Sequence, residues 1–188
     1  MRQYLDFEKS LAELESKIDE LRRMTEPGGI NIADEVARLR DKAEKQLRAT
    51  YARLTPWQQV QVARHPDRPK AAAYLSGLLT EFTPLGGDRG FADDAALIGG
   101  LGRFRGQAVV AMGTERGSDT ESRVRHNFGM ARPEGYRKAR RLVELAGRFG
   151  LPVLSFVDTA GAFPGIDAEA RGQAEAIARA IEAFLAAP

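Results

Sequence analysis

The sequence contains no cysteine, which excludes disulfide bonds, thiolate nucleophiles and cysteine-ligated zinc. It has only two histidines, His65 and His126, and neither has a second histidine nearby with which to share a metal ion. We therefore expect no metal site in this chain. No apolar run approaches the roughly 18 residues of a membrane span, and the first residues lack the apolar segment of a signal peptide. These absences predict a cytoplasmic protein that does not bind a membrane.

An excess of charge of one sign is also lacking. The 28 Lys and Arg residues nearly balance the 26 Asp and Glu residues, so the net charge of +2 gives no reason to expect a nucleic-acid partner. No Gly-Lys dipeptide occurs, so Asp158-Thr159-Ala160-Gly161 is not interpreted as the switch of a GTPase, which needs a phosphate-binding loop. The G-x-S-x-G motif of serine hydrolases is absent too. What remains is the composition of a globular protein, and 188 residues fit one domain with an added arm.

Residues 1–87 are predicted to form a helical N-terminal arm. Apolar residues recur there at helical spacing, in two sets: Leu11, Leu14, Ile18 and Leu21, then Val36, Leu39, Ala43 and Leu47. Glu26-Pro27-Gly28-Gly29 separates the two sets, which indicates a helical hairpin. The prolines between Thr55 and Pro84 indicate short helices and connectors.

Residues 88–188 are predicted to form an α/β core, because strand and helix patterns alternate along them. The expected elements are a β-hairpin of Ala96–Phe104 and Gln107–Gly113, a helix from Pro133 to Gly150, a strand at Leu151–Val157 buried on both faces, and a last helix from Asp167. The last helix is expected to carry an apolar stripe of Ile177, Ile181, Phe184 and Leu185.

Two segments of this core are candidate ligand sites. A glycine-containing loop follows the predicted strand, where α/β sheets bind ligands, and Gly161 and Gly165 would let a ligand approach its backbone. A purely structural turn would use the same residues. The second segment is a basic cluster before the Pro133 helix, whose N-terminus attracts anions. Arg125 and Arg137 are its best candidates for binding a phosphate or carboxylate, and a solvated surface is the alternative.

Several motifs together resemble one family. They are RHNFGMARPEGYRKARRL at 125–142, VDTAGAFPG at 157–165, EARGQAEAIA at 169–178, ARHPDRP at 63–69, GDR at 87–89 and ADDAA at 92–96. Their order and residues closely resemble the alpha subunits of bacterial acetyl-coenzyme A carboxylase carboxyltransferases, over nearly the whole chain. Ala160 and Phe163 depart from the family, which more often has Pro and Tyr at these positions.

The resemblance implies a crotonase-like fold and the second half-reaction of malonyl-coenzyme A synthesis, for fatty acid biosynthesis. In that reaction carboxybiotin, on the biotin carboxyl carrier protein, gives its carboxyl group to acetyl-coenzyme A. The implied partners are a carboxyltransferase beta subunit with a zinc ribbon, the carrier protein and biotin carboxylase, with an alpha2beta2 arrangement of the carboxyltransferase subunits in a cytoplasmic complex.

The resemblance also assigns expected roles to site residues. Both reacting groups develop negative oxygens, which backbone amides can stabilise by about 3 kcal/mol each. We expect the amides of Gly161 and Ala162 to act in this way on the biotin side. The residues expected to bind substrate are Thr159, Phe163, Gly165, Arg125, Gly129 and Arg137.

In one respect the sequence departs from its family. Members of the family continue into a further strand and a Gly-Gly loop that supplies an oxyanion-hole amide, so we expect a truncated core that is inactive alone. Two alternatives remain: a non-catalytic interaction fragment of the same subunit, and another crotonase-like acyl-coenzyme A enzyme such as a decarboxylase or hydratase. The long charged arm and the motif from Asn127 to Arg137 argue against the second alternative.

Overall fold

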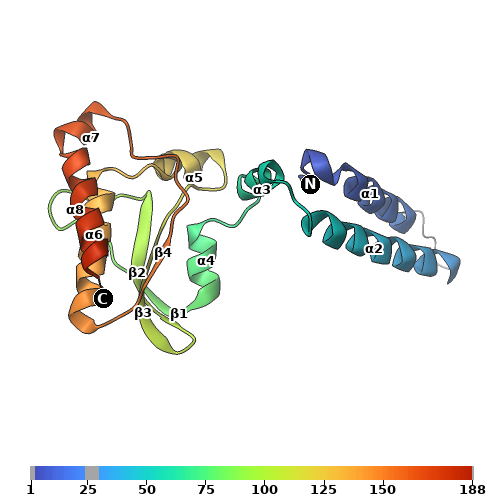
Figure 1. Ribbon diagram of the computed structural model, residues 1–188, viewed down its shortest axis with the longest axis horizontal. Coiled ribbons are helices and arrows are strands. Elements are labelled where there is room, and N and C mark those ends of the chain that lie inside the picture. Colours follow the sequence, from blue (N-terminus) through green and yellow to red (C-terminus); the bar gives the residue numbers. More distant parts are fainter. Residues whose placement is uncertain (1–2, 24–29, 188) are drawn as a thin grey trace. The chain divides into compact units, whose positions relative to one another are not determined.

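The computed structural model describes residues 3–23 and 30–187, in two compact units that divide at Arg68 and Pro69. Each unit is described by itself (Figure 1). The expected boundary between arm and core, after residue 87, lies later than this division. The reason is that residues before Gly87 form a helix and a strand that pack within the second unit.

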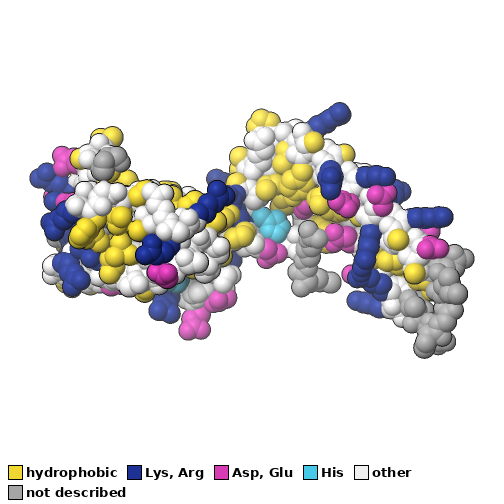
Figure 2. Space-filling model, turned by 90° about the horizontal axis from the view of Figure 1, so that it is seen from below, with side chains coloured by type: hydrophobic (Ala, Val, Ile, Leu, Met, Phe, Trp, Pro, Cys, Tyr) yellow, Lys and Arg dark blue, Asp and Glu magenta, His cyan; other side chains and the backbone are white. Residues whose placement is uncertain are grey.

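The first unit is helical. It consists of a 3-10 turn η1 (Asp6–Glu8) and the helices α1 (Lys9–Arg23), α2 (Ile30–Tyr51) and α3 (Pro56–Ala63). Helices α1 and α2 pack on each other, and their buried apolar residues are Leu11, Ile18, Leu39 and Ala43. The predicted pairing of two amphipathic helices is thus confirmed, whereas the predicted break at Glu26-Pro27-Gly28-Gly29 lies outside the described residues. Charged side chains of both signs cover the outside of these helices (Figure 2).

The second unit is built on a four-stranded sheet in the order β1-β2-β3-β4. Its strands are β1 (Leu79–Pro84), β2 (Leu97–Phe104), β3 (Gln107–Thr114) and β4 (Val153–Phe156). The first three are antiparallel, and β4 runs parallel to β3. The predicted hairpin of β2 and β3 is confirmed, with Arg105 and Gly106 at positive φ in its turn, as a two-residue hairpin loop requires. Strand β1 was not predicted, because its residues follow a short apolar helix without alternation.

Helices cover both faces of the sheet, as in an α/β domain (Figure 1). Helix α6 (Pro133–Phe149) packs Leu142 and Val143 against Val110 and Met112 on one face. Helix α4 (Ala71–Leu78) packs Leu75 against Val109 and Ala111 on the other. The prediction that α6 begins at Pro133 and stops before Gly150 is confirmed, since Gly150 ends it in the left-handed conformation.

Strand β4 differs from the prediction. Leu151–Val157 was expected to be buried on both faces, but the residues of β4 are half-buried or exposed and Val157 is 76% exposed. That prediction is wrong because β4 is an edge strand: among the described residues, no strand pairs with its outer side.

The end of the described chain also differs from the prediction. The single last helix is divided into α7 (Ile166–Ala170) and α8 (Gln173–Ala186), because Gly172 between them has a φ of 79°. Helix α8 packs on α6 through Ala176 and Ala180. Ile181, Phe184 and Leu185 of the predicted stripe are exposed.

Two short elements complete the second unit. Helix α5 (Thr120–Arg125) and a 3-10 turn η2 (Asn127–Gly129) lie between β3 and α6. Among the described residues, no helix combines the length and apolar character needed to cross a membrane.

Candidate active site

The predicted glycine loop leaves the sheet at the end of β4, next to the end of β3. Because β3 and β4 are parallel, their carboxyl ends lie at the same end of the sheet. The Asp158 amide donates a hydrogen bond to Thr114 Oγ1 at 2.7 Å, and the Asp158 carboxylate pairs with Arg116 at 3.2 Å. These contacts fix the start of the loop to the last residue of β3 and to Arg116, which follows it.

The loop after β4 and the loop before α6 are joined by hydrogen bonds. Thr159 Oγ1 lies 2.6 Å from the Gly129 carbonyl oxygen, and the Phe163 amide donates to the Ala131 carbonyl oxygen at 3.0 Å. The Arg132 guanidinium lies 4.6 Å from the centre of the Phe163 ring. The structure therefore brings together Thr159, Phe163 and Gly129, three of the residues predicted to form the site.

Glycine is required at two positions of these loops. A side chain at Gly129, which has a φ of 80°, would lie 2.5 Å from Arg116 Cγ and 3.0 Å from the Asp158 carbonyl oxygen. A side chain at Gly165 would overlap the Phe163 ring. Gly165 is the N-cap residue immediately before α7, and its carbonyl oxygen accepts the amides of Ala168 and Glu169. Both glycines are therefore needed for these loops to pack closely against their neighbours, and neither leaves room for a ligand at this position.

The two predicted oxyanion donors differ in their hydrogen bonding. The Gly161 amide donates to Thr159 Oγ1 at 3.1 Å, so it is already paired within the loop. Within the part of the chain that the structure describes, the Ala162 amide has no hydrogen-bond acceptor. Gly161 has a φ of 149°, and no atom lies within 4 Å of the place that a side chain would take there. The loop therefore presents an unpaired amide at Ala162 beside open space at Gly161, and among the described residues the amides of Thr159, Ala160 and Gly165 have no acceptor either.

The predicted arginines do not converge on this loop. Arg137 forms ion pairs with Asp88 at 3.4 Å and Glu134 at 3.9 Å, and it donates to the Arg171 carbonyl oxygen. Its charge is thus compensated inside the protein. Arg125 lies on an exposed position at the end of α5.

The N-terminus of α6, which was expected to attract an anion from a ligand, already holds one from the chain. Asp94 is 3% exposed; its Oδ2 accepts the Arg132 amide at 2.7 Å, and its Oδ1 accepts the Ala96 amide at 3.0 Å. Burial raises the pKa of Asp94, although these hydrogen bonds and the nearby Lys138 and Arg132 favour its charged form. The helix dipole is therefore satisfied by an internal carboxylate.

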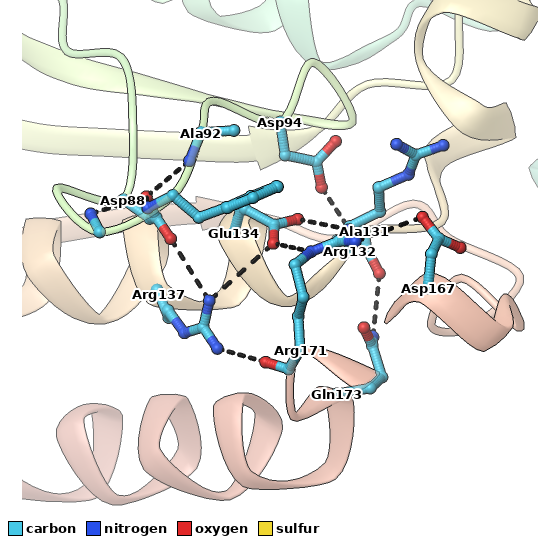
Figure 3. A network of polar contacts seen from close by, with 12 residues as sticks. Asp88, Ala92, Asp94, Ala131, Arg132, Glu134, Arg137, Asp167, Arg171 and Gln173 are labelled. Carbon is cyan, nitrogen blue, oxygen red and sulfur yellow. Dashed lines mark hydrogen bonds and ion pairs between the residues drawn. The ribbon is translucent and has the colours of Figure 1, made fainter. Parts of the chain in front are cut away.

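A polar network ties the site loops to α7 and α8 (Figure 3). Glu134, which is 2% exposed, accepts a hydrogen bond from Arg171 Nε at 2.6 Å, and Arg171 also pairs with Asp167 at 3.4 Å. Gln173 Nε2 donates to the Ala131 carbonyl oxygen at 3.1 Å. The network therefore fixes the loop before α6 to Arg171 and Gln173, the segment where α7 ends and α8 begins.

The sequence indicated no binding or catalytic role for Asp88, Asp94, Glu134 or Arg171. All four lie in the motifs on which the family resemblance was based, and that was the only available signal. Their partners are distant in the sequence, so spacing could not reveal the pairs. Among the described residues, no group of His, Cys, Asp or Glu side chains is arranged to hold a metal ion.

The chain was compared with known protein families and sequences. Residues 4–187 match the family described as acetyl co-enzyme A carboxylase carboxyltransferase-like. The chain is 71% identical over 188 residues to the acetyl-coenzyme A carboxylase carboxyl transferase subunit alpha of Gluconacetobacter diazotrophicus, and 70% identical over 188 residues to that of Acidiphilium cryptum. Each alignment covers 100% of this chain and 59% of the relative.

A solved structure shows the same fold. A transcarboxylase 12S structure with hydrolysed methylmalonyl-coenzyme A bound aligns with 65% of this chain and 22% of its own chain, with a TM-score of 0.51 and 19% sequence identity. This likeness confirms the predicted crotonase-like α/β fold class.

Proposed function

Because the chain belongs to the acetyl-coenzyme A carboxylase carboxyltransferase-like family, we propose that it forms part of the alpha subunit that transfers a carboxyl group to acetyl-coenzyme A. The chain spans 59% of the length of the relatives named above, and the activity proposed is that of the whole subunit with its partners. The observation that carries the proposal at the level of residues is the unpaired Ala162 amide beside the open space at Gly161.

The product proposed is malonyl-coenzyme A, and the carboxyl donor proposed is carboxybiotin on a carrier protein. This donor supplies an activated carboxyl group whose loss leaves negative charge on an oxygen of the biotin ring. The loop fits such a group in two respects: an amide donor without a partner, and a glycine at which no side chain blocks approach. The proposed partners are a beta subunit with a zinc ribbon, the carrier protein and biotin carboxylase, in a cytoplasmic alpha2beta2 complex.

In this proposal the residues of the chain act by position and hydrogen bonding. The Ala162 N–H donates to the oxygen on which charge develops, and a preorganised donor of this kind contributes about 3 kcal/mol to transition-state stabilisation. Thr159 holds the loop against Gly129 and keeps the Gly161 amide oriented. The Phe163 ring, stacked on Arg132, forms an apolar wall beside the donor. No side-chain nucleophile is needed.

The experiment that tests this function uses a complete subunit. The 188 residues of this chain replace the matching residues of the Gluconacetobacter diazotrophicus subunit, which is then assembled with that organism's other carboxylase proteins. We expect Gly161→Ala to reduce carboxyl transfer by about tenfold or more, because alanine is strained at a φ of 149° and the change would rotate the neighbouring Ala162 amide. Malonyl-coenzyme A formation is the measurement.

Gly77→Ala is the matched control. Gly77 is an exposed residue of α4, and no atom lies within 4 Å of the added methyl group there either. This variant should transfer carboxyl groups at the unmodified rate. Normal turnover of the Gly161→Ala enzyme, with assembly intact, would remove the loop from the proposed mechanism.

A further inference from the structure

One backbone oxygen joins three segments of the second unit. The Ala131 carbonyl oxygen, which lies before α6, accepts the Phe163 amide of the loop after β4 at 3.0 Å. It also accepts Gln173 Nε2, at the start of α8, at 3.1 Å. Figure 3 shows the Gln173 side chain reaching toward this oxygen. A carbonyl oxygen has two lone pairs, so both are in use here.

Gln173 donates this hydrogen bond from a fixed place. It is 3% exposed and is the first residue of α8. The residue two positions before it is held by α6, because the Arg171 carbonyl oxygen accepts Arg137 Nη2 and Arg171 Nε donates to Glu134 at 2.6 Å. A buried side chain on an anchored backbone has few other rotamers open to it, so the position of its donor is well defined.

The side-chain amide of Gln173 is used at one end only. Within the part of the chain that the structure describes, Gln173 Oε1 is buried and no donor lies within hydrogen-bond distance of it. Turning the amide over would place Oε1 against the Ala131 oxygen, and two acceptors repel each other. A buried polar atom without a partner is unfavourable, so packing alone does not favour glutamine at this position. What glutamine contributes there is the donor Nε2.

The hydrogen bond from Gln173 bears on the amide that we assign to carboxyl transfer. The Ala162 amide lies between two paired amides, because the Gly161 amide donates to Thr159 Oγ1 and the Phe163 amide donates to the Ala131 oxygen. The second of these bonds fixes the peptide plane that joins Ala162 to the next residue. A shift of the Ala131 oxygen would therefore change the direction of the Ala162 N–H.

We propose that Gln173 is a positioning residue for carboxyl transfer, which orients the Ala162 amide through the Ala131 carbonyl and the Phe163 amide. Gln173 itself does not touch the reacting groups. The inference rests on the proposed function and adds to it a residue of α8, outside both site loops. A donor stabilises a transition state only where it is held in place beforehand, so such a residue acts on the chemical step rather than on substrate binding.

The test is Gln173→Met in the complete subunit that carries the 188 residues of this chain. Methionine keeps the length of the side chain but cannot donate a hydrogen bond. We expect kcat for malonyl-coenzyme A formation to fall by about fivefold or more, while the KM for acetyl-coenzyme A changes by less than about twofold.

Thermal unfolding of the purified 188-residue chain separates this role from a purely structural one. The midpoint should not fall in Gln173→Met, because methionine removes the buried unpaired oxygen and the Ala131 oxygen keeps the Phe163 amide. A purely structural role predicts the reverse, a lower midpoint with an unchanged kcat, and that result overturns the proposal. A fall in kcat that only reflects a loss of folded enzyme overturns it too.

Hydrogen exchange gives a readout that does not depend on activity. In the Gln173→Met chain the Phe163 amide, followed by NMR, should exchange faster than in the unmodified chain by about threefold or more, because its acceptor is no longer held from α8. An equal rate of exchange in the two chains would show that Gln173 does not hold the loop, and would overturn the proposal whatever the activity.

Gln107→Met is the matched control. Gln107 is an exposed residue that begins β3, whereas the site loop is bonded to Thr114 at the other end of that strand. This variant should leave kcat, the midpoint and the exchange of the Phe163 amide unchanged. A normal kcat in Gln173→Met beside slow transfer by Gly161→Ala overturns this inference alone. A complete subunit that forms no malonyl-coenzyme A before any substitution overturns the proposed function, and this inference with it.

Discussion

At the scale of single residues, Asp88 shows how one buried carboxylate organises a loop. Its side chain is 1% exposed and accepts the amides of Gly90, Phe91 and Ala92 at 2.7–3.0 Å. Burial raises the pKa of Asp88, but these amides and Arg137 outweigh burial and lower the pKa below its ordinary 3.8. The folded protein thus favours the ionised carboxylate.

A dependence of stability on pH follows from this lowered pKa. We expect Asp88→Asn to reduce the free energy of unfolding by about 1–2 kcal/mol near neutral pH, because the hydrogen bonds lose their charged acceptor. The group's contribution is fully present above pH 3.8 and is lost as the pH falls through the lower pKa of the folded state. Urea denaturation of both proteins over this pH range measures the difference. A difference that stays constant with pH would contradict the assignment.

Asp94 serves as a control, because its pKa is shifted in the opposite direction from that of Asp88. Burial raises the pKa of this carboxyl group, so the folded protein retains its proton more strongly than the unfolded chain does. Its contribution to stability is therefore largest below the ordinary value of 3.8 and declines as the pH rises through the higher pKa of the folded state. Asp94→Asn should accordingly be least damaging, relative to the unmodified protein, near neutral pH.

At the scale of elements, the end of α6 contains two glycines with opposite requirements. Gly150 ends the helix at a φ of 61°, whereas Gly147 lies within the helix, and no atom would contact a methyl group at either position. We expect Gly150→Ala to destabilise the protein by about 1 kcal/mol, because alanine is strained in the left-handed conformation.

Gly147→Ala should stabilise the protein by about 0.5–1 kcal/mol, because alanine is the better residue inside a helix. Thermal unfolding of the two variants tests both signs at once. If both substitutions destabilised the protein, the position at which α6 ends would have to be reconsidered.

At the scale of the whole molecule, the two units differ in how much apolar surface their elements bury. In α1 and α2 the buried apolar residues are Leu11, Ile18, Leu39 and Ala43, whereas the sheet of the second unit is packed by helices on both faces. We expect the amides of α1 and α2 to exchange hydrogen for deuterium faster than those of β2, β3 and α6, because less burial stabilises them. Mass spectrometry of peptides from each unit measures this difference. Equal protection in both units would show that they unfold together.

Local sequence patterns were enough to predict several helices, one hairpin and the family. Helical spacing predicted the α1 and α2 pair, a two-residue turn predicted the β2–β3 hairpin, and Pro133 and Gly150 marked the ends of α6. These features depend on residues close together in the chain, whose backbone preferences are readable without a fold. The motifs that suggested the family are likewise continuous stretches, and the family match confirmed them.

Which distant side chains contact one another is visible only in the folded protein. The capping of α6 by Asp94, the pairing of Glu134 with Arg171 and the joining of the two site loops through Thr159 all connect residues far apart in the sequence. The partial burial of β4 could not be read from its own residues either, because an apolar run has the same pattern whether a neighbouring strand covers it or not. Arg137 looked like a ligand-binding residue in the sequence, and only the fold placed Asp88 and Glu134 against its charge.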